Sequence, residues 1–121
     1  LTVRENILLP ALLAGEEAAA AARAEQTAKD IQDEVDALAE LRVDSSSVYY
    51  CDAQNLSMLL ECLQHRIAAI NNAWEADLKY SDPADYEQEI TEPISRDKVD
   101  GKNRYKTEFD KLYPQARVTR K

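Results

Sequence analysis

The sequence predicts an all-α protein: a long antiparallel helical hairpin, similar to a coiled coil, followed by one or two shorter C-terminal helices. Two stretches carry apolar residues spaced alternately three and four apart, which is the spacing of a helix that packs along one side. A serine-rich break, Asp44 to Ser47, separates the two stretches. Only 2 of the 121 residues are glycine, which argues against the many tight turns of a β-sandwich.

We expect one helical domain with three parts. Residues 1–9 form an N-terminal arm, either a short helix or an extended segment, that ends at Pro10. Residues 10–80 form the hairpin, and residues 81–121 form a C-terminal helical segment with a basic tail. Because the chain begins at Leu1 and not at Met, we also expect that a leader preceded it or that it is part of a longer protein.

The first long helix is expected from about Pro10 to Arg42, since proline suits a first turn and a cation suits the C-terminal end of the helix dipole. Its core stripe begins with alanine and ends with larger residues: Ala14, Ala21, Ala24, Ala28, Ile31, Val35 and Leu38. An alanine seam lets a partner approach closely, so we expect one end of the hairpin to be tighter. The opposite face is charged and includes a candidate acidic surface of Asp33, Asp36 and Glu40.

The second long helix is expected from about Ser47 to Lys79, with a start at Asp52 or Asn55 as the alternative. The side-chain oxygens of residues 44–47 can accept the free N–H groups of a first turn. The later start would leave residues 48–51 extended, because Val-Tyr-Tyr favours β structure. The core stripe of this helix comprises Leu56, Leu60, Leu63, Ile67, Ile70 and Trp74.

Two shorter helices are expected after the hairpin. The first runs from Pro83 to about Ile90 and is interrupted by Glu92-Pro93. The second segment runs from about Ser95 to Tyr113, with a turn at Asp100-Gly101 inside it. Residues 116–121 have the composition of a frayed tail.

The charge of the chain is unevenly distributed. The net charge is −8, but residues 1–95 carry 19 acidic and 6 basic residues, whereas residues 96–121 carry 4 acidic and 9 basic residues. A basic tail on an acidic body can pair within the chain, pair with a neighbouring subunit or face an anionic partner. The acidic body would repel phosphates, so we expect no nucleic-acid partner, although the tail carries lysine, arginine and tyrosine.

The residues that could carry chemistry do not form a complete site. Cys51 and Cys62 would lie about 16 Å apart along one helix, which is too far for a disulfide. We expect buried free thiols, with a bond through a bent connection or between subunits as the alternative. The only histidine, His65, follows Leu63 by two positions and Glu61 by four, and we expect it on the helix surface. We therefore expect no metal, no cofactor and no enzymatic activity.

Two functions remain open. The first is a non-enzymatic protein–protein interaction protein, such as an assembly subunit, adaptor or chaperone, whose candidate interaction faces are the second stripe together with Ile31, Val35 and Leu38. The second is an acidic inhibitor or immunity-type protein that neutralises a basic partner. The most apolar stretch, residues 7–14, is shorter than the roughly 20 residues of a membrane span. Because an alanine seam buries little area, we expect a homo-oligomer or a docked partner helix, with a parallel self-associating coil as the alternative arrangement.

Overall fold

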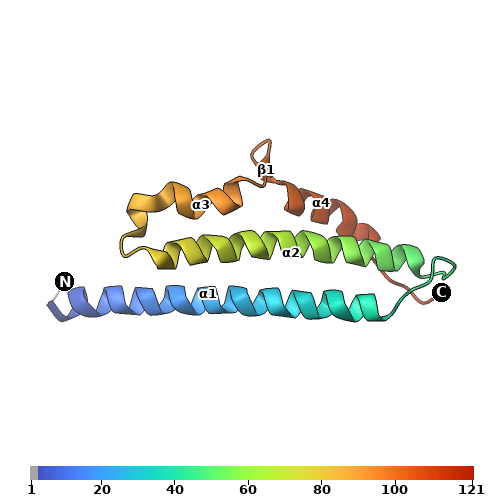
Figure 1. Cartoon of the computed structure of the whole chain (residues 1–121), viewed down its shortest axis with the longest axis horizontal. Coiled ribbons are helices and arrows are strands. Elements are labelled where there is room, and N and C mark those ends of the chain that lie inside the picture. The colour runs from blue at the N-terminus through green and yellow to red at the C-terminus, as the bar shows by residue number, and fades with distance from the viewer. Residues whose placement is uncertain (1–2) are drawn as a thin grey trace.

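The computed structural model describes residues 3–121, and it describes their side chains from Gly15 onward. Within these residues the chain forms four α-helices, two short 3-10 turns and one two-stranded antiparallel hairpin (Figure 1). The elements in chain order are α1 (Val3–Glu40), α2 (Tyr50–Lys79), η1 (Pro83–Tyr86), α3 (Glu87–Ser95), β1 (Lys98–Val99), β2 (Lys102–Asn103), α4 (Arg104–Leu112) and η2 (Tyr113–Gln115).

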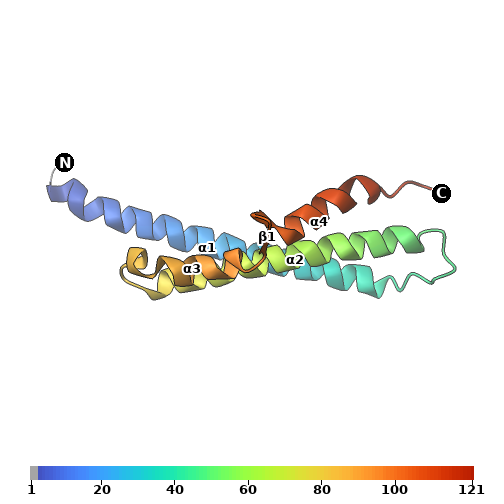
Figure 2. The same ribbon diagram turned by 90° about the horizontal axis from the view of Figure 1, so that it is seen from above.

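The α2 helix lies in the middle of an elongated molecule. The α1 helix packs antiparallel along one side of α2, and α3 and α4 pack along the other side (Figure 1). This arrangement confirms the predicted all-α fold with a long antiparallel hairpin and shorter C-terminal helices. The N-terminal part of α1 diverges from α2 and continues past its end (Figure 2).

The first helix is longer at its start than the sequence predicts. It begins at Val3, so the predicted start near Pro10 is wrong, and Pro10 lies inside the helix. The leucines and alanines around Pro10 favour a helix, and they outweigh the one backbone hydrogen bond that proline removes. The helix ends at Glu40, and Arg42 follows in the left-handed region with a φ of 46°. The predicted core residue Ala14 lies outside the residues whose side chains are described.

The second helix begins at Tyr50, so the predicted start at Ser47 and the later alternatives are both wrong. None of the predicted capping residues caps this helix, because their oxygens close turns within the connection. A carboxylate oxygen of Asp44 accepts a hydrogen bond from the backbone N–H of Ser46 at 3.1 Å. The hydroxyl of Ser47 accepts one from the backbone N–H of Tyr49, also at 3.1 Å.

The C-terminal segment differs from the prediction at two places. Pro93 does not interrupt the helix but lies buried inside α3, in the last turn, where the helix ends two residues later in any case. The predicted turn at Asp100-Gly101 is confirmed, but it joins β1 to β2 instead of interrupting a helix. Both residues have positive φ angles, 53° and 79°, as the two-residue turn of a β-hairpin requires.

The hydrophobic core is small and follows α2. The buried side chains among those described are Ala24, Leu59, Cys62, Ala69, Ala73 and Pro93. The four on α2 each precede a residue of the predicted stripe by one position, so they form a second stripe rotated by about 100°. This second stripe was not predicted, and it is the reason that α2 can pack on two sides.

Candidate interaction surface

The predicted interaction faces lie mainly between α1 and α2. The six stripe residues of α2 and the residues Ile31, Val35 and Leu38 of α1 are all half-buried. Polar contacts hold the same seam: the Gln64 side-chain amide donates to Gln32 Oε1 at 2.9 Å, and Asn71 donates to the backbone carbonyl of Ala24 at 3.4 Å. The seam is therefore closed along its middle, and what remains available lies along its edges and at its ends.

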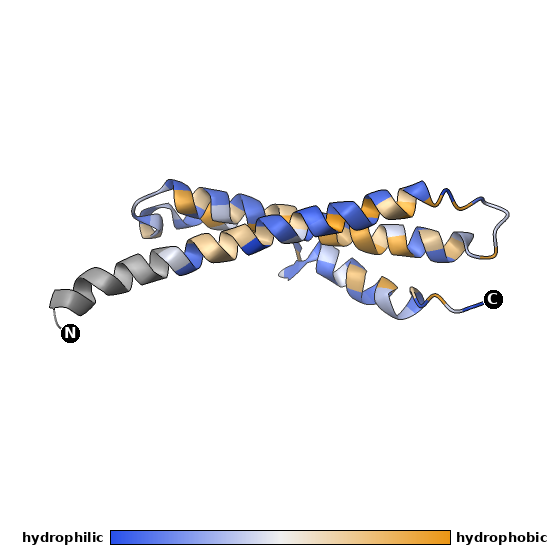
Figure 3. Cartoon of the chain, turned by 90° about the horizontal axis from the view of Figure 1, so that it is seen from below, coloured by the Kyte–Doolittle hydropathy of each residue, from blue (hydrophilic) through white to orange (hydrophobic). Residues whose placement is uncertain are grey.

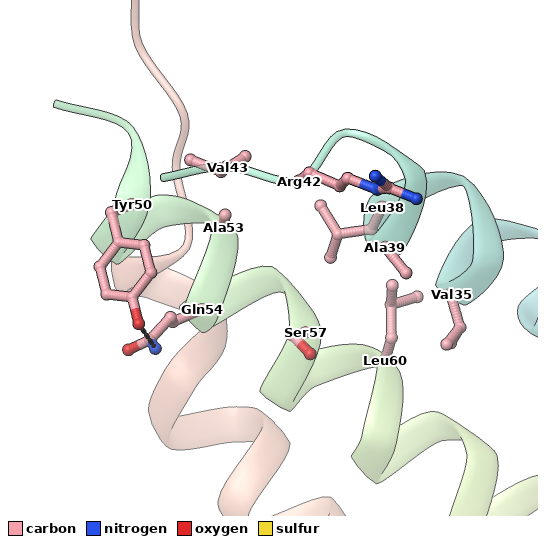
Figure 4. Close-up of a pocket in the computed structure, with 10 residues that line it drawn as sticks. All are labelled: Val35, Leu38, Ala39, Arg42, Val43, Tyr50, Ala53, Gln54, Ser57 and Leu60. Carbon is pink, nitrogen blue, oxygen red and sulfur yellow. Dashed lines mark hydrogen bonds between the residues drawn. The ribbon is translucent and has the colours of Figure 1, made fainter. Parts of the chain in front are cut away.

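One shallow groove opens at the loop end of the hairpin (Figure 4). It encloses about 260 Å³ between the end of α1, with Val35 and Leu38, and the start of α2, with Ala53 and Leu60. Tyr50 and Gln54 close one side, where the Gln54 amide donates a hydrogen bond to the Tyr50 hydroxyl at 2.7 Å. The walls are largely apolar, so this groove can accept apolar side chains.

A larger groove, here called the hairpin-end groove, lies beside the first one and shares Leu38, Val43 and Ala53 with it. It encloses about 460 Å³. Its remaining lining residues are Leu41, Asp44, Ser47, Tyr49, Asp52, Leu56 and Val118. Val118 comes from the C-terminal tail, so two distant parts of the chain build this groove.

The basic tail reaches this end of the molecule, so the expectation of a frayed tail is wrong. The backbone N–H of Lys121 donates to the Tyr49 hydroxyl at 2.9 Å. The Lys121 ammonium lies 3.2 Å from a carboxylate oxygen of Asp52, whose side chain is only 13% exposed. An apolar residue and a lysine of the tail thus lie against an apolar groove with acidic residues in its wall.

Large apolar side chains are exposed around the hairpin-end groove. The exposed fractions are 70% for Leu41, 67% for Val48 and 49% for Val118. Singly exposed apolar residues are ordinary on protein surfaces, whereas a group of them around an apolar groove marks an interaction site. The hairpin-end groove is therefore the candidate site of this chain.

The predicted acidic residues lie on the outer face of α1, away from the seam. Asp33, Asp36 and Glu40 are exposed, and the middle of α1 is largely hydrophilic on the side that faces the viewer in Figure 3. Among the residues whose side chains are described, none of the three forms an ion pair, and Asp36 accepts one hydrogen bond from Gln32 at 2.9 Å. Their charges are thus available to a basic partner.

A cluster of ionisable residues, which sequence reasoning missed, lies where α4 packs on α2. His65 stacks on Tyr105 with ring centroids 4.2 Å apart, and its Nε2 lies 3.8 Å from a carboxylate oxygen of Glu61. This confirms the predicted surface position of His65, because its side chain is 47% exposed. Cys62 and Glu108 share the same small cavity of about 180 Å³. No sequence spacing links residues of α2 to those of α4, so only the fold brings them together.

The chemistry of this cluster favours packing over reaction. Burial raises the pKa of the Cys62 thiol, and the nearby carboxylates of Glu108 and Glu61 raise it further. A nucleophilic cysteine typically has a lowered pKa, and Cys62 has the opposite shift. Both cysteines are free, as expected, but Cys51 is exposed, so the expectation that it is buried is wrong. Cys51 lies in the first turn of α2, outside the packed part of the helix.

Metal-binding clusters and membrane-spanning helices were sought in the same residues. Within the described residues, no three His, Cys, Asp or Glu side chains are grouped so that they can hold a metal ion. In the same part of the chain, none of the helices has the length and apolar composition needed to cross a bilayer. No protein-family model, curated protein or solved structure matches this chain.

Proposed function

We propose that this chain is a non-enzymatic helical interaction protein, an assembly subunit, adaptor or chaperone, that acts through apolar helix surfaces. The observation that carries the proposal is the accessible surface, which is 9218 Å² for a chain of 13.7 kDa. A compact monomer of this mass exposes about 6,600 Å². The excess of about 2,600 Å² is large beside the roughly 800 Å² that each partner contributes to a standard protein interface.

The small core also supports the proposal of an interaction protein. Apart from Leu59, the buried side chains are alanine, cysteine and proline, and no described side chain is less than 2% exposed. Each large apolar side chain that becomes fully buried contributes about 1.5–3 kcal/mol, and here most of that gain is still to be made. A chain of this kind gains stability when another protein covers its apolar surfaces.

The hairpin-end groove is the surface that we assign to a different protein. An apolar groove between two helices suits the apolar face of an amphipathic helix. Because Asp44 and Asp52 line the groove and Lys121 of the tail pairs with Asp52, we propose that the partner helix carries basic residues.

The alternative function, an acidic inhibitor, is supported by the exposed carboxylates of Asp33, Asp36 and Glu40. Under that alternative the partner binds to the outer face of α1, and charge accelerates the association. The two functions therefore use different surfaces, and substitutions can separate them.

The test is affinity capture from the native source with three forms of the full chain. One form is native, one carries Leu41→Asp and Val118→Asp, and one carries charge reversals to lysine at Asp33, Asp36 and Glu40. An interaction protein loses its captured partner in the second form only, and an acidic inhibitor loses it in the third only. Val99→Asp is the matched control, because Val99 is 56% exposed and lies on β1, which is near the middle of the molecule and away from the loop end of the hairpin (Figure 1). Equal capture by all forms, or a partner lost equally with Val99→Asp, would contradict the proposal.

A further inference from the structure

Asp52 is an enclosed carboxylate in the wall of the hairpin-end groove. Its side chain is 13% exposed, and its Oδ2 atom is buried and accepts no hydrogen bond from any described residue. The Lys121 ammonium lies 3.2 Å from this same oxygen, as an ion pair without the geometry of a hydrogen bond. A buried carboxylate is unfavourable unless a cation compensates its charge. Asp52 therefore needs a cation beside it, and in the described part of the chain that cation is Lys121.

Few contacts hold Lys121 in this position. Besides the ion pair, its backbone N–H donates a hydrogen bond to the Tyr49 hydroxyl at 2.9 Å. Residues 117–121 are exposed and have no regular secondary structure, and the Lys121 side chain is itself 40% exposed. An ion pair with so accessible a cation contributes little to stability. Lys121 can therefore leave Asp52 at a small cost in free energy, provided that another cation takes its place.

The tail covers only one corner of the hairpin-end groove. It reaches the loop end of the hairpin, as Figures 1 and 2 both show. With Val118 and Lys121 in place the groove still encloses about 460 Å³, and Leu41 in its wall is 70% exposed. The apolar part of the groove is thus accessible, whereas the acidic corner at Asp52 is already occupied. A partner that enters the groove meets Lys121 at this corner.

We propose that Lys121 is an internal competitor for a cation of the partner: it compensates Asp52 in the free chain, and a basic side chain of the partner helix replaces it on binding. The inference rests on the proposed interaction function and adds the regulation of the same groove. Asp52 keeps a cation beside it in both states, so its buried charge is never left alone. The cost of releasing Lys121 is subtracted from the affinity for the partner.

The competitor also makes the groove selective for basic partners. A helix that offers only an apolar face leaves Lys121 at Asp52 and gains no ion pair, and an acidic helix places a like charge beside this carboxylate. A helix with lysine or arginine beside its apolar face gains both contacts. Because Lys121 belongs to the same chain, dilution of the protein does not remove it from the groove.

Titration of the full chain with a fluorescently labelled synthetic helix of leucine and lysine tests the competition, with the dissociation constant measured by fluorescence anisotropy. Arg120→Ala is the matched control for Lys121→Ala. It removes the neighbouring positive charge, and Arg120 is exposed and forms no ion pair with a described residue. We expect Lys121→Ala to bind the peptide about fivefold more tightly than Arg120→Ala does, because only the first substitution frees Asp52.

Asp52→Asn separates direct competition from the overall change in charge. Asparagine keeps the shape of the side chain but has no charge that either lysine could compensate. In the presence of Asp52→Asn, Lys121→Ala should therefore no longer change the affinity for the leucine–lysine peptide. A synthetic helix of leucine and glutamate should gain nothing from Lys121→Ala in either case.

Three results would overturn the inference. These are equal affinities of Lys121→Ala and Arg120→Ala, a gain from Lys121→Ala that persists with Asp52→Asn, and a leucine–lysine peptide that binds no form of the chain. The proposed function is decided separately by capture from the native source. A partner that the native chain captures, and that the form with Leu41→Asp and Val118→Asp does not, would leave that function standing even if Lys121 does not compete.

Discussion

Asp100 and Gly101 show how two adjacent residues determine the geometry of the C-terminal segment. Both have positive φ angles, and the turn that they form returns the chain to the end of α3, so that α4 follows α3 along α2 (Figure 1). The side chain of Asn103 then caps α4, since its oxygen accepts the backbone N–H groups of Tyr105 and Lys106, each at 3.0 Å. The direction of α4 is thus set by local residue choices.

Replacing Gly101 with alanine should destabilise the protein. The residue has a φ of 79°, where a Cβ clashes with the backbone, so we expect a loss of about 1 kcal/mol in the free energy of unfolding. Urea unfolding followed by circular dichroism measures the loss. Gly101→Asn is the control, because asparagine tolerates this conformation and should retain most of the stability. An alanine variant as stable as the native chain would show that the turn does not hold this geometry.

At the scale of elements, the end of α2 and α3 are joined through Tyr80. Its ring stacks on Tyr86 with centroids 3.7 Å apart, and its hydroxyl donates a hydrogen bond to the Glu89 carboxylate. This hydrogen bond is the main cause that raises the pKa of Tyr80 above 10.0, its ordinary value. The bond needs the protonated phenol, so its contribution to stability is complete below the ordinary pKa and is lost as the pH rises through the raised one.

Replacing Tyr80 with phenylalanine keeps the stacked ring and removes the hydrogen bond. The native chain should therefore be more stable than the Tyr80→Phe variant at neutral pH, and the difference should disappear in strongly alkaline solution. Urea unfolding of both proteins across that pH range measures the difference. A difference that persists unchanged where Tyr80 is ionised would mean that the hydrogen bond does not join α3 to α2.

The hairpin could be predicted from the sequence because its stripes repeat over many turns of helix. Leu56, Leu60 and Leu63 specify one side of α2 wherever the rest of the chain packs. The second stripe was harder to recognise, because apart from Leu59 its buried residues are cysteine and alanine, and it includes Arg66. Neither alanine nor cysteine marks a helix face clearly in a sequence, although both pack well in a narrow space.

The candidate site could be predicted only in part, because the contribution of the tail depends on contacts between residues that are distant in the sequence. Leu38 and Leu56 belong to the predicted stripes and line the hairpin-end groove. Val118 and Lys121 do not follow from any local pattern, since Lys121 contacts Tyr49 across 72 positions of the chain. Two predicted helix boundaries were also wrong, because each was placed at a proline that lies inside a helix. These prolines are Pro10 in α1 and Pro93 in α3.

The whole molecule is a long, thin arrangement in which no helix is surrounded. α2 has neighbours on two sides, and α1 packs along one side of α2 (Figures 1 and 2). The charges are also separated in space. Acidic residues cover the outer face of α1, and one basic residue of the tail, Lys121, pairs with Asp52 at the loop end of the hairpin. Leu41, Val48 and Val118 leave exposed apolar surface at the loop end of the hairpin.

The central claim is that another protein covers apolar surface that this chain leaves exposed, and capture with the variant of the hairpin-end groove tests it most directly. The native chain and the Val99→Asp control should capture the same partner from the native source, whereas the form with Leu41→Asp and Val118→Asp should not, because carboxylates in an apolar groove oppose the docking of an apolar helix face. A partner captured equally by all three forms would contradict the claim and would mean that the hairpin-end groove is not the surface through which this chain binds.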